Sequence, residues 1–267
     1  MPHHFKTIIM KRVLLLAILM GIVLPILNAQ TPPPPPGDHP RMNATYIKDR
    51  GVGSRVNFGV TFAPTINWMY DHTTGYEKNG VVMGMRYGLN LNINLTHGKN
   101  FYFSTGLFAE HTGGKMKFLD NIPIGPLGIA DSTLTQRTYR SIYLSIPTGI
   151  TMKTNSINNF YICGNVGLMH SFNLNASNID SYYFGEELWS RQRVSSDEAA
   201  LFKESFFVGV GFEYAVTPSM RAGVMINYAQ SFTNYFKGQG KARNGLSGVD
   251  QRANLGCVEI ALNINFF

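Results

Sequence analysis

The chain has 267 residues with 23 basic and 16 acidic side chains. The predicted signal segment, residues 1–29, contains three basic residues and no acidic one, so the remainder carries 20 basic and 16 acidic residues, a net charge of +4. This small, scattered excess predicts no nucleic-acid partner, and the length suits one β-domain.

The first segment has the features of a secretory signal. Lys11 and Arg12 precede the apolar run 13–27, and the small residue Ala29 supplies a cleavage site. We therefore predict export, with residues 1–29 as the signal peptide. Residues 30–54 form a predicted proline-rich periplasmic leader, because five consecutive prolines favour a stiff polyproline spacer. Residues 55–267 remain for the folded domain.

The stretch 206–228 reads as a β-hairpin. Its two arms alternate strictly between a bulky apolar face and a face of small or charged residues, and they meet at a turn containing Pro218. A period of two over arms this long predicts β-strands. Bulky residues on one face and small ones on the other are typical of a membrane barrel, whose interior is narrow and polar.

The same alternation predicts eight strands along the chain. The connections after the second, fourth and sixth strands are short, and those after the odd-numbered strands are long, as in outer-membrane barrels with short periplasmic turns and long outer loops. We therefore predict an all-β fold, an eight-stranded antiparallel up-and-down transmembrane β-barrel in a bacterial outer membrane. The predicted strands are 55–70, 81–95, 101–110, 139–153, 160–172, 206–216, 220–228 and 255–267.

A soluble lipocalin-like barrel is the main alternative fold, and it would place the apolar face inside. About forty bulky side chains share that face, more than the narrow interior of an eight-stranded barrel accommodates. On the outside they match an apolar band flanked by aromatic girdles. The predicted girdle residues near the strand ends are Trp68, Tyr70, Tyr139, Phe101, Phe160 and Tyr214.

Two features inside the strands carry further predictions. Pro147 cannot donate a hydrogen bond to a neighbouring strand, so we expect a β-bulge there. Cys163 and Cys257 are the only cysteines. Their positions along their strands predict different heights in the barrel, so we expect two unpaired, buried thiols rather than a disulfide.

The segment 143–150, YLSIPTGI, is followed by a turn and by the segment 159–167, NFYICGNVG. This pattern resembles PorT-like, porin-family outer-membrane β-barrel domains, over residues 55–267. The resemblance implies an outer-membrane barrel without catalytic residues, with a role in envelope assembly or secretion. It also implies insertion by the barrel insertion machinery. Phe266 supplies the C-terminal aromatic residue in register with the apolar face, and Phe267 oversteps that register.

No phosphate-binding loop, zinc-ligand spacing or nucleophile elbow occurs, so we predict no catalytic, cofactor or metal site. A small-solute porin remains an alternative function. A second alternative is an outer-leaflet lipid-modifying enzyme, suggested by polar residues near the outer strand ends. These residues are Asp71, His72, His111, His170 and Ser171.

The expected partners are membrane components. Outer-membrane lipid surrounds the barrel, and the basic last connection, with Lys237, Lys241, Arg243 and Arg252, faces lipopolysaccharide phosphates or solvent. The barrel insertion machinery is a second partner, and an envelope protein of open identity is a third.

Charged residues on the inward-facing parity predict how the interior is filled. The predicted turn at 96–100 places Arg86 directly opposite Glu110. Glu259 is expected at a similar height, within reach of Arg86 across the narrow barrel, and the predicted turn at 217–219 sets Glu213 opposite or diagonal to Arg221. Confined charges persist only when they are paired, so we predict a central ionic plug with Arg86 as its hub and no open pore. The predicted lumen ionic network, a structural site, consists of Arg86, Glu110, Glu213, Arg221 and Glu259.

Overall fold

The computed structural model describes residues 55–72, 75–96, 100–124, 129–184, 187–194, 198–237 and 252–266. Side chains are described in these ranges except within 120–133 and 182–194. The predicted signal peptide, the leader and Phe267 lie outside the described residues. In the described part, no helix is long and apolar enough to cross a membrane.

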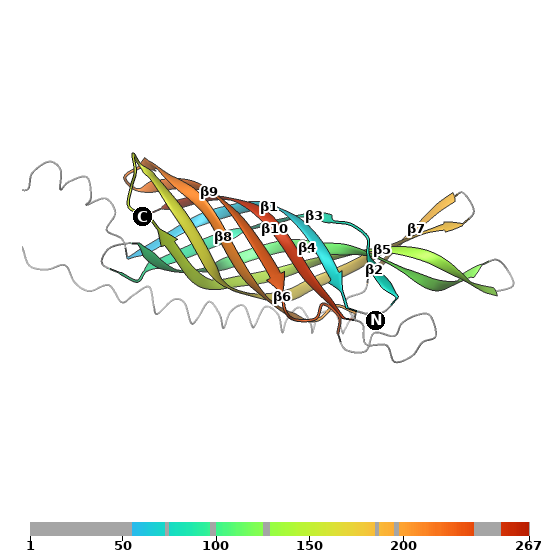
Figure 1. Ribbon diagram of the computed structural model, residues 1–267. Helices are drawn as coiled ribbons and strands as arrows, with labels where there is room; N and C mark the ends of the chain where they lie inside the picture. The colour runs from blue at the N-terminus through green and yellow to red at the C-terminus, as the bar shows by residue number, and fades with distance from the viewer. Residues whose placement is uncertain are drawn as a thin grey trace, which may run out of the picture. The chain divides into compact units, whose positions relative to one another are not determined.

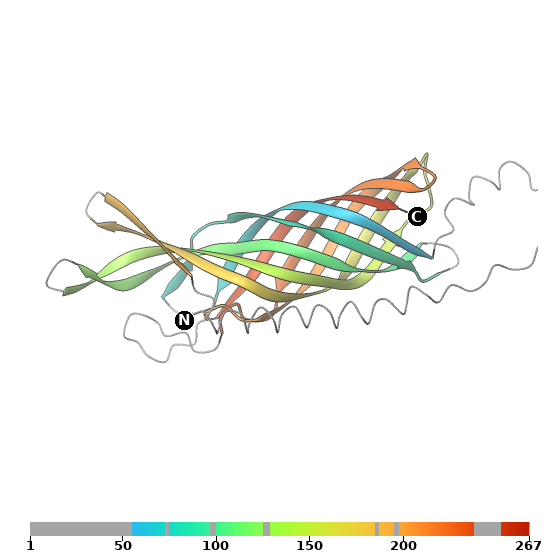
Figure 2. The same cartoon turned by 180° about the vertical axis from the view of Figure 1, so that it is seen from behind.

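Eight long strands form a closed antiparallel barrel, shown from two sides in Figures 1 and 2. Each strand pairs with its neighbours along the chain, and the first pairs with the last to close the sheet. Two short strands, β2 (Tyr76–Lys78) and β7 (Glu187–Val194), pair with β4 and β6. The barrel strands are β1 (Val56–Asp71), β3 (Val82–Asn94), β4 (Phe101–Ile124), β5 (Ile129–Lys153), β6 (Phe160–Phe184), β8 (Phe202–Thr217), β9 (Met220–Ser231) and β10 (Ala253–Phe266).

The alternating pattern places the two faces as predicted. In β3, Leu89 is 63% exposed on the outside, whereas Arg86 is 8% exposed in the interior. Aromatic residues from different strands meet on the outer surface near both ends of the barrel, for example Phe58 on β1 with Phe266 on β10, and Trp68 on β1 with Tyr228 on β9. The girdle prediction for Tyr139 is wrong: its side chain is 1% exposed. The inward parity of β5 turns it into the interior.

Strands β4, β5 and β6 continue well beyond their predicted ends. The connections predicted at 111–138 and 173–201 consist largely of paired strands, because the β4–β5 ladder runs to Ile124↔Ile129 and β6 pairs with β7. Two hairpins therefore project beyond the barrel at one end (Figures 1 and 2). Their backbone groups are satisfied by cross-strand pairing, which does not require apolar side chains.

The predicted bulge at Pro147 is wrong. Pro147 stays in register opposite Met169, and the register shift lies instead between Ile142 and Tyr143, where Leu174 is an extra residue in β6. One extra residue exchanges the two faces of a strand, so residues of β6 beyond Leu174 reverse their orientation. The prediction that Cys163 and Cys257 are unpaired is confirmed; Cys163 is buried as predicted, whereas Cys257 is half-buried.

Candidate functional site

The interior is the candidate site, and its end near the short turns holds an ion pair. Lys153 Nζ donates to both carboxylate oxygens of Glu213 at 2.7 Å and lies 4.9 Å from the centre of the Tyr102 ring. Asn265 Nδ2 also donates to Glu213, at 3.1 Å. The guanidinium of Arg221 stacks on a neighbouring tyrosine, Tyr161, at 4.1 Å.

These contacts differ from the predicted partnership of Glu213 with Arg221. The ladder places Ala215 opposite Arg221, so Glu213 is diagonal to it, as the turn geometry allowed. The carboxylate nevertheless bonds Lys153, the last residue of β5. The alternation of β5 places Lys153 on the inward face. Because Lys153 is the last residue before the turn, the sequence does not indicate that its side chain extends into the interior.

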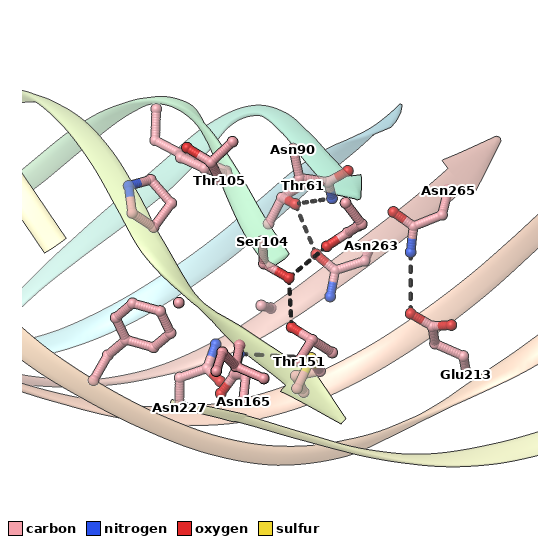
Figure 3. A pocket seen from close by; sticks show the side chains of 18 of the residues that line it. Thr61, Asn90, Ser104, Thr105, Thr151, Asn165, Glu213, Asn227, Asn263 and Asn265 are labelled. Atoms are coloured by element: carbon pink, nitrogen blue, oxygen red, sulfur yellow. Dashed lines mark hydrogen bonds between the residues drawn. The ribbon is translucent and has the colours of Figure 1, made fainter. Parts of the chain in front are cut away.

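A polar chamber of about 90 Å³ lies next to this pair. Ser104 Oγ donates to Asn92 at 2.7 Å and shares a 2.7 Å hydrogen bond with Thr151, as Figure 3 shows in part. A polar cavity of this size holds several water molecules. Four side-chain amide oxygens lining it accept no hydrogen bond from the described protein groups: those of Asn90, Asn165, Asn227 and Asn265.

Two ion pairs fill the middle of the interior. Arg86 bonds Glu259, whose carboxylate also accepts a 2.6 Å hydrogen bond from Asn227 Nδ2. Lys203 Nζ donates to Glu110 at 2.6 Å. The predicted register is confirmed, because Arg86 lies directly opposite Glu110 in the ladder. The predicted Arg86–Glu110 ion pair is not formed, because Glu110 bonds Lys203 instead. The predicted contact of Glu259 with Arg86 across the barrel is confirmed.

Lys203 is the second interior cation that the sequence reading missed. It lies three residues before the predicted start of its strand, at Phe206. The alternation of β8 extends back to Phe202, which puts Lys203 on the inward parity, and its side chain is 5% exposed. Extending the period of two past Phe206 would have found it.

Beyond these pairs, an aromatic cap closes the interior among the described residues. Tyr235 and Phe236, which follow β9, turn inward and pack against Tyr139 at ring-centre distances of 5.7 and 5.5 Å. Tyr235 shares a 2.8 Å hydrogen bond with Ser141, and burial raises the pKa of Tyr235. The cap consists of Met69, Met116, Tyr139, Tyr143, Ala176, Ala199, Tyr235, Phe236, Ala253 and Leu255.

The backbone holds the cap in place. Ala200 N donates to Tyr235 O at 2.7 Å, and Tyr235 N donates to Ala253 O at 2.8 Å. Phe236 forms an isolated bridge with Ala199. The connection after β9 is thereby fixed to the segment that precedes β8 and to the first residue of β10.

A fourth buried ion pair lies at the base of the projecting hairpins. Arg137 bonds Asp180 from the neighbouring strand, and Glu198 lies 3.8 Å from the same guanidinium. Burial opposes the charge of Arg137, but the hydrogen bonds and the negative charge of Asp180 hold its pKa above the ordinary value. Asp180 faces inward because of the bulge at Leu174, so parity counted from the barrel does not predict this pair.

The residues suggested for an outer-leaflet enzyme are not brought together. His170 lies on the outside, where it contacts Glu204 at 2.9 Å and Thr148 at 3.0 Å. Its neighbour Ser171 faces the interior, 2.9 Å from Ser145 Oγ. Adjacent residues of a strand point to opposite faces. In the described residues, no group of three or more His, Cys, Asp or Glu side chains is arranged to hold a metal ion.

Among known proteins, the chain is similar to several solved structures of outer-membrane proteins. No protein-family model matches the sequence, and no curated protein matches it. Neisserial surface protein A is 12% identical with a TM-score of 0.37, covering 80% of this chain and 97% of that one. Ail of Yersinia pestis is 12% identical with a TM-score of 0.34, covering 80% and 100%.

The outer membrane protease OmpT from Escherichia coli is 10% identical with a TM-score of 0.38, covering 79% of this chain and 96% of that one. The PorT-like resemblance stays a prediction. The fold follows from the strand pairing itself: the chain forms a closed, eight-stranded antiparallel β-barrel.

Proposed function

We propose that this chain is an exported, non-enzymatic protein of the bacterial outer membrane with a structural or interaction role. The observation that carries the proposal is a contrast between the interior and the ends of the strands. The interior is filled by paired charges and an aromatic cap, whereas β4–β7 continue into two projecting hairpins. In this proposal the lumen ionic network is a structural plug, and the hairpins are the working surface.

The outer surface of the barrel supports the membrane location. Bulky apolar residues in the middle of the strands are highly exposed, including Leu89 at 63% and Val210 at 64%. Large apolar surfaces are rare on soluble monomers, and lipid removes the cost of exposing them. An aromatic girdle near each end of this surface fits the two membrane interfaces.

An interaction role predicts protein partners in the cell envelope that take part in envelope assembly or secretion. It is tested by shortening one hairpin and comparing proteins cross-linked in intact envelopes. Phe118 and Thr135 are paired across the hairpin, so joining them through Asn-Gly replaces residues 119–134 without changing the register. We expect this variant to insert but to lose its cross-linked partner.

The control for this experiment is Ile157→Ser, at a turn at the opposite end of the barrel, which should retain the partner. Unchanged cross-linking after hairpin removal would contradict the interaction role of that hairpin. Two alternatives have separate tests. A small-solute porin predicts steady conductance in bilayers. A lipid-modifying enzyme predicts altered lipid mass spectra in a strain lacking the protein.

A further inference from the structure

Outward-facing basic residues gather on one arc of the barrel, beside the base of the β4–β5 hairpin. In β4, Thr112, Gly114 and Met116 are buried, so Lys115 points outward. In β5, Tyr139 and Ser141 are buried, and Arg140 is exposed on the outer face.

The ladder makes these two residues diagonal neighbours, because Lys115 pairs with Thr138 and Gly113 with Arg140. A third cation, Lys78, lies at the end of β2. The next residue, Asn79, donates its N–H to Lys115 O at 3.0 Å.

The aromatic girdle fixes the height of this group. Lys78 Nζ lies 5.6 Å from the ring centre of Trp68 and 5.2 Å from that of Tyr70, both on the outer face of β1. Tryptophan and tyrosine in such girdles lie at the level of the lipid headgroups. The ammonium group is therefore placed where lipid phosphates occur.

The three cations are not neutralised by the described side chains. Lys78, Lys115 and Arg140 form no ion pair with a described acidic residue, and the nearby Glu77 is bound to Lys117 at 2.8 Å. The opposite arc differs, because His170 on β6 faces Glu204 on β8 there. Among the described residues, these three cations lie together on the side of the barrel formed by β2, β4 and β5.

We propose that Lys78, Lys115 and Arg140 bind the phosphate-bearing headgroup of an outer-leaflet lipid. Lys115 and Arg140 are diagonal neighbours on adjacent strands, and the ammonium group of Lys78 lies over the outer-face rings of Trp68 and Tyr70 at the same end of the barrel, so a single headgroup is the proposed ligand of all three side chains. The arginine fork binds phosphate oxygens in pairs, and the lysines add point charges. Exposed Met83 and Met85 on β3 provide apolar surface for the acyl chains. The inference rests on the proposed membrane location and adds a lipid partner.

The test is native mass spectrometry of the refolded full-length mature chain in detergent, titrated with diphosphoryl lipid A. The double variant Lys115→Gln/Arg140→Gln should bind about tenfold to thirtyfold more weakly, because each basic residue near anionic lipid contributes to affinity. The control Arg55→Gln removes a positive charge from an exposed position at the opposite end of the barrel and should bind like the unmodified protein. Weakening by Arg55→Gln equal to that by the double variant would overturn the site.

Two further titrations test whether the ligand is a phosphorylated lipid. Dephosphorylated lipid A should bind no better to the unmodified protein than to the double variant, and excess inorganic phosphate should not displace diphosphoryl lipid A. Equal binding of both lipid forms, or displacement by free phosphate, would contradict a phosphorylated lipid headgroup. The charge-conserving variant Lys115→Arg/Arg140→Lys keeps the positive surface and should retain binding, which separates lost charge from a folding defect.

Different results would contradict the proposed membrane location and the proposed headgroup site. A protein absent from outer-membrane fractions contradicts the proposed location, whatever it binds in detergent. A correctly inserted barrel without phosphate-dependent lipid binding contradicts the headgroup site and leaves the proposed location intact.

Discussion

The two halves of the barrel interior are built differently. The half near the short turns contains a polar chamber lined by amides and hydroxyls, with one ion pair beside it. The other half contains two ion pairs and then a fully packed aromatic cap. The first half has room and acceptors for several water molecules, whereas the cavity in the second half has a volume of only about 10 Å³. The difference indicates that closure is made at the mouth that carries the hairpins.

The chamber and the cap also differ in the segments of the chain that supply their residues. The chamber is lined by strand residues whose inward orientation follows from alternation. The cap depends on Tyr235 and Phe236, which belong to a connection and turn back into the barrel. The plug is therefore a joint product of barrel strands and one connecting segment.

The largest expected effect comes from breaking the central ion pair. Arg86→Ala leaves Glu259 buried without its cation, which should lower the free energy of unfolding by about 3–5 kcal/mol. Hydration from the neighbouring chamber would reduce this loss. The measurement is urea unfolding of the refolded protein in lipid or detergent.

Two double-mutant cycles test which carboxylate is the partner of Arg86. The coupling energy of Arg86→Ala with Glu259→Ala should exceed that of Arg86→Ala with Glu110→Ala, because the first pair is bonded and Glu110 bonds Lys203 instead. Equal coupling in both cycles would show that the two ion pairs are not distinct.

The next effect concerns the outer wall. Leu89→Arg introduces a charge on the lipid face near the middle of β3 and should cost about 2–4 kcal/mol. The matched change Leu95→Arg lies beyond the end of that strand and should cost about 0–1 kcal/mol. Refolding titrations into lipid vesicles measure both. Similar costs at the two depths would contradict the placement of the apolar band.

Opening the cap should expose the interior beneath it. Cys257 lines a small cavity together with Glu110 and Lys203, on the cap side of the interior. In the variant Tyr235→Ala/Phe236→Ala, a small thiol reagent added on the hairpin side should modify Cys257 at least about tenfold faster. A loss of about 1.4 kcal/mol in protection already corresponds to that factor.

The control for cap opening is Phe232→Ala, which removes an exposed aromatic residue of the same connection. It should leave the rate at Cys257 unchanged. Cys163, packed with Ala63 and Met225, should remain unreactive in both variants. Fast labelling of Cys257 in the unmodified protein would show that the cap does not exclude solvent.

The smallest effect is a pH dependence at the cap. Burial raises the pKa of Tyr235 above its ordinary value of about 10. A raised pKa in the folded state means that stability is fully present below pH 10 and falls as the pH rises above it. Tyr235→Phe should flatten the decline in unfolding free energy between about pH 9 and 11. An unchanged slope would contradict burial of the hydroxyl.

Much of the barrel follows from alternation in the sequence. The eight strands, their two faces, the closed topology and the Arg86–Glu110 register depend on local periodicity and short turns, which a single sequence displays. The unpaired state of Cys163 and Cys257 follows from the same counting, since residues at different heights cannot form a disulfide.

The remaining features depend on contacts that periodicity does not encode. The extra residue Leu174 reverses the faces of β6, so Asp180 meets Arg137 against the parity of the barrel. Lys203 is different: it follows the period of two, but the strand predicted from Phe206 begins at Phe202 and so includes it. The inward turn of Tyr235 and Phe236 is a tertiary packing event, and neither aromatic residue lies in a strand.

Single-channel recording in planar bilayers tests the closed interior most directly. The unmodified mature protein should insert and give no steady conductance, because the ion pairs Arg86–Glu259 and Glu110–Lys203 and the aromatic cap fill the path. Uniform, long-lived conductance steps from the inserted, unmodified barrel would contradict the plug and favour the small-solute porin.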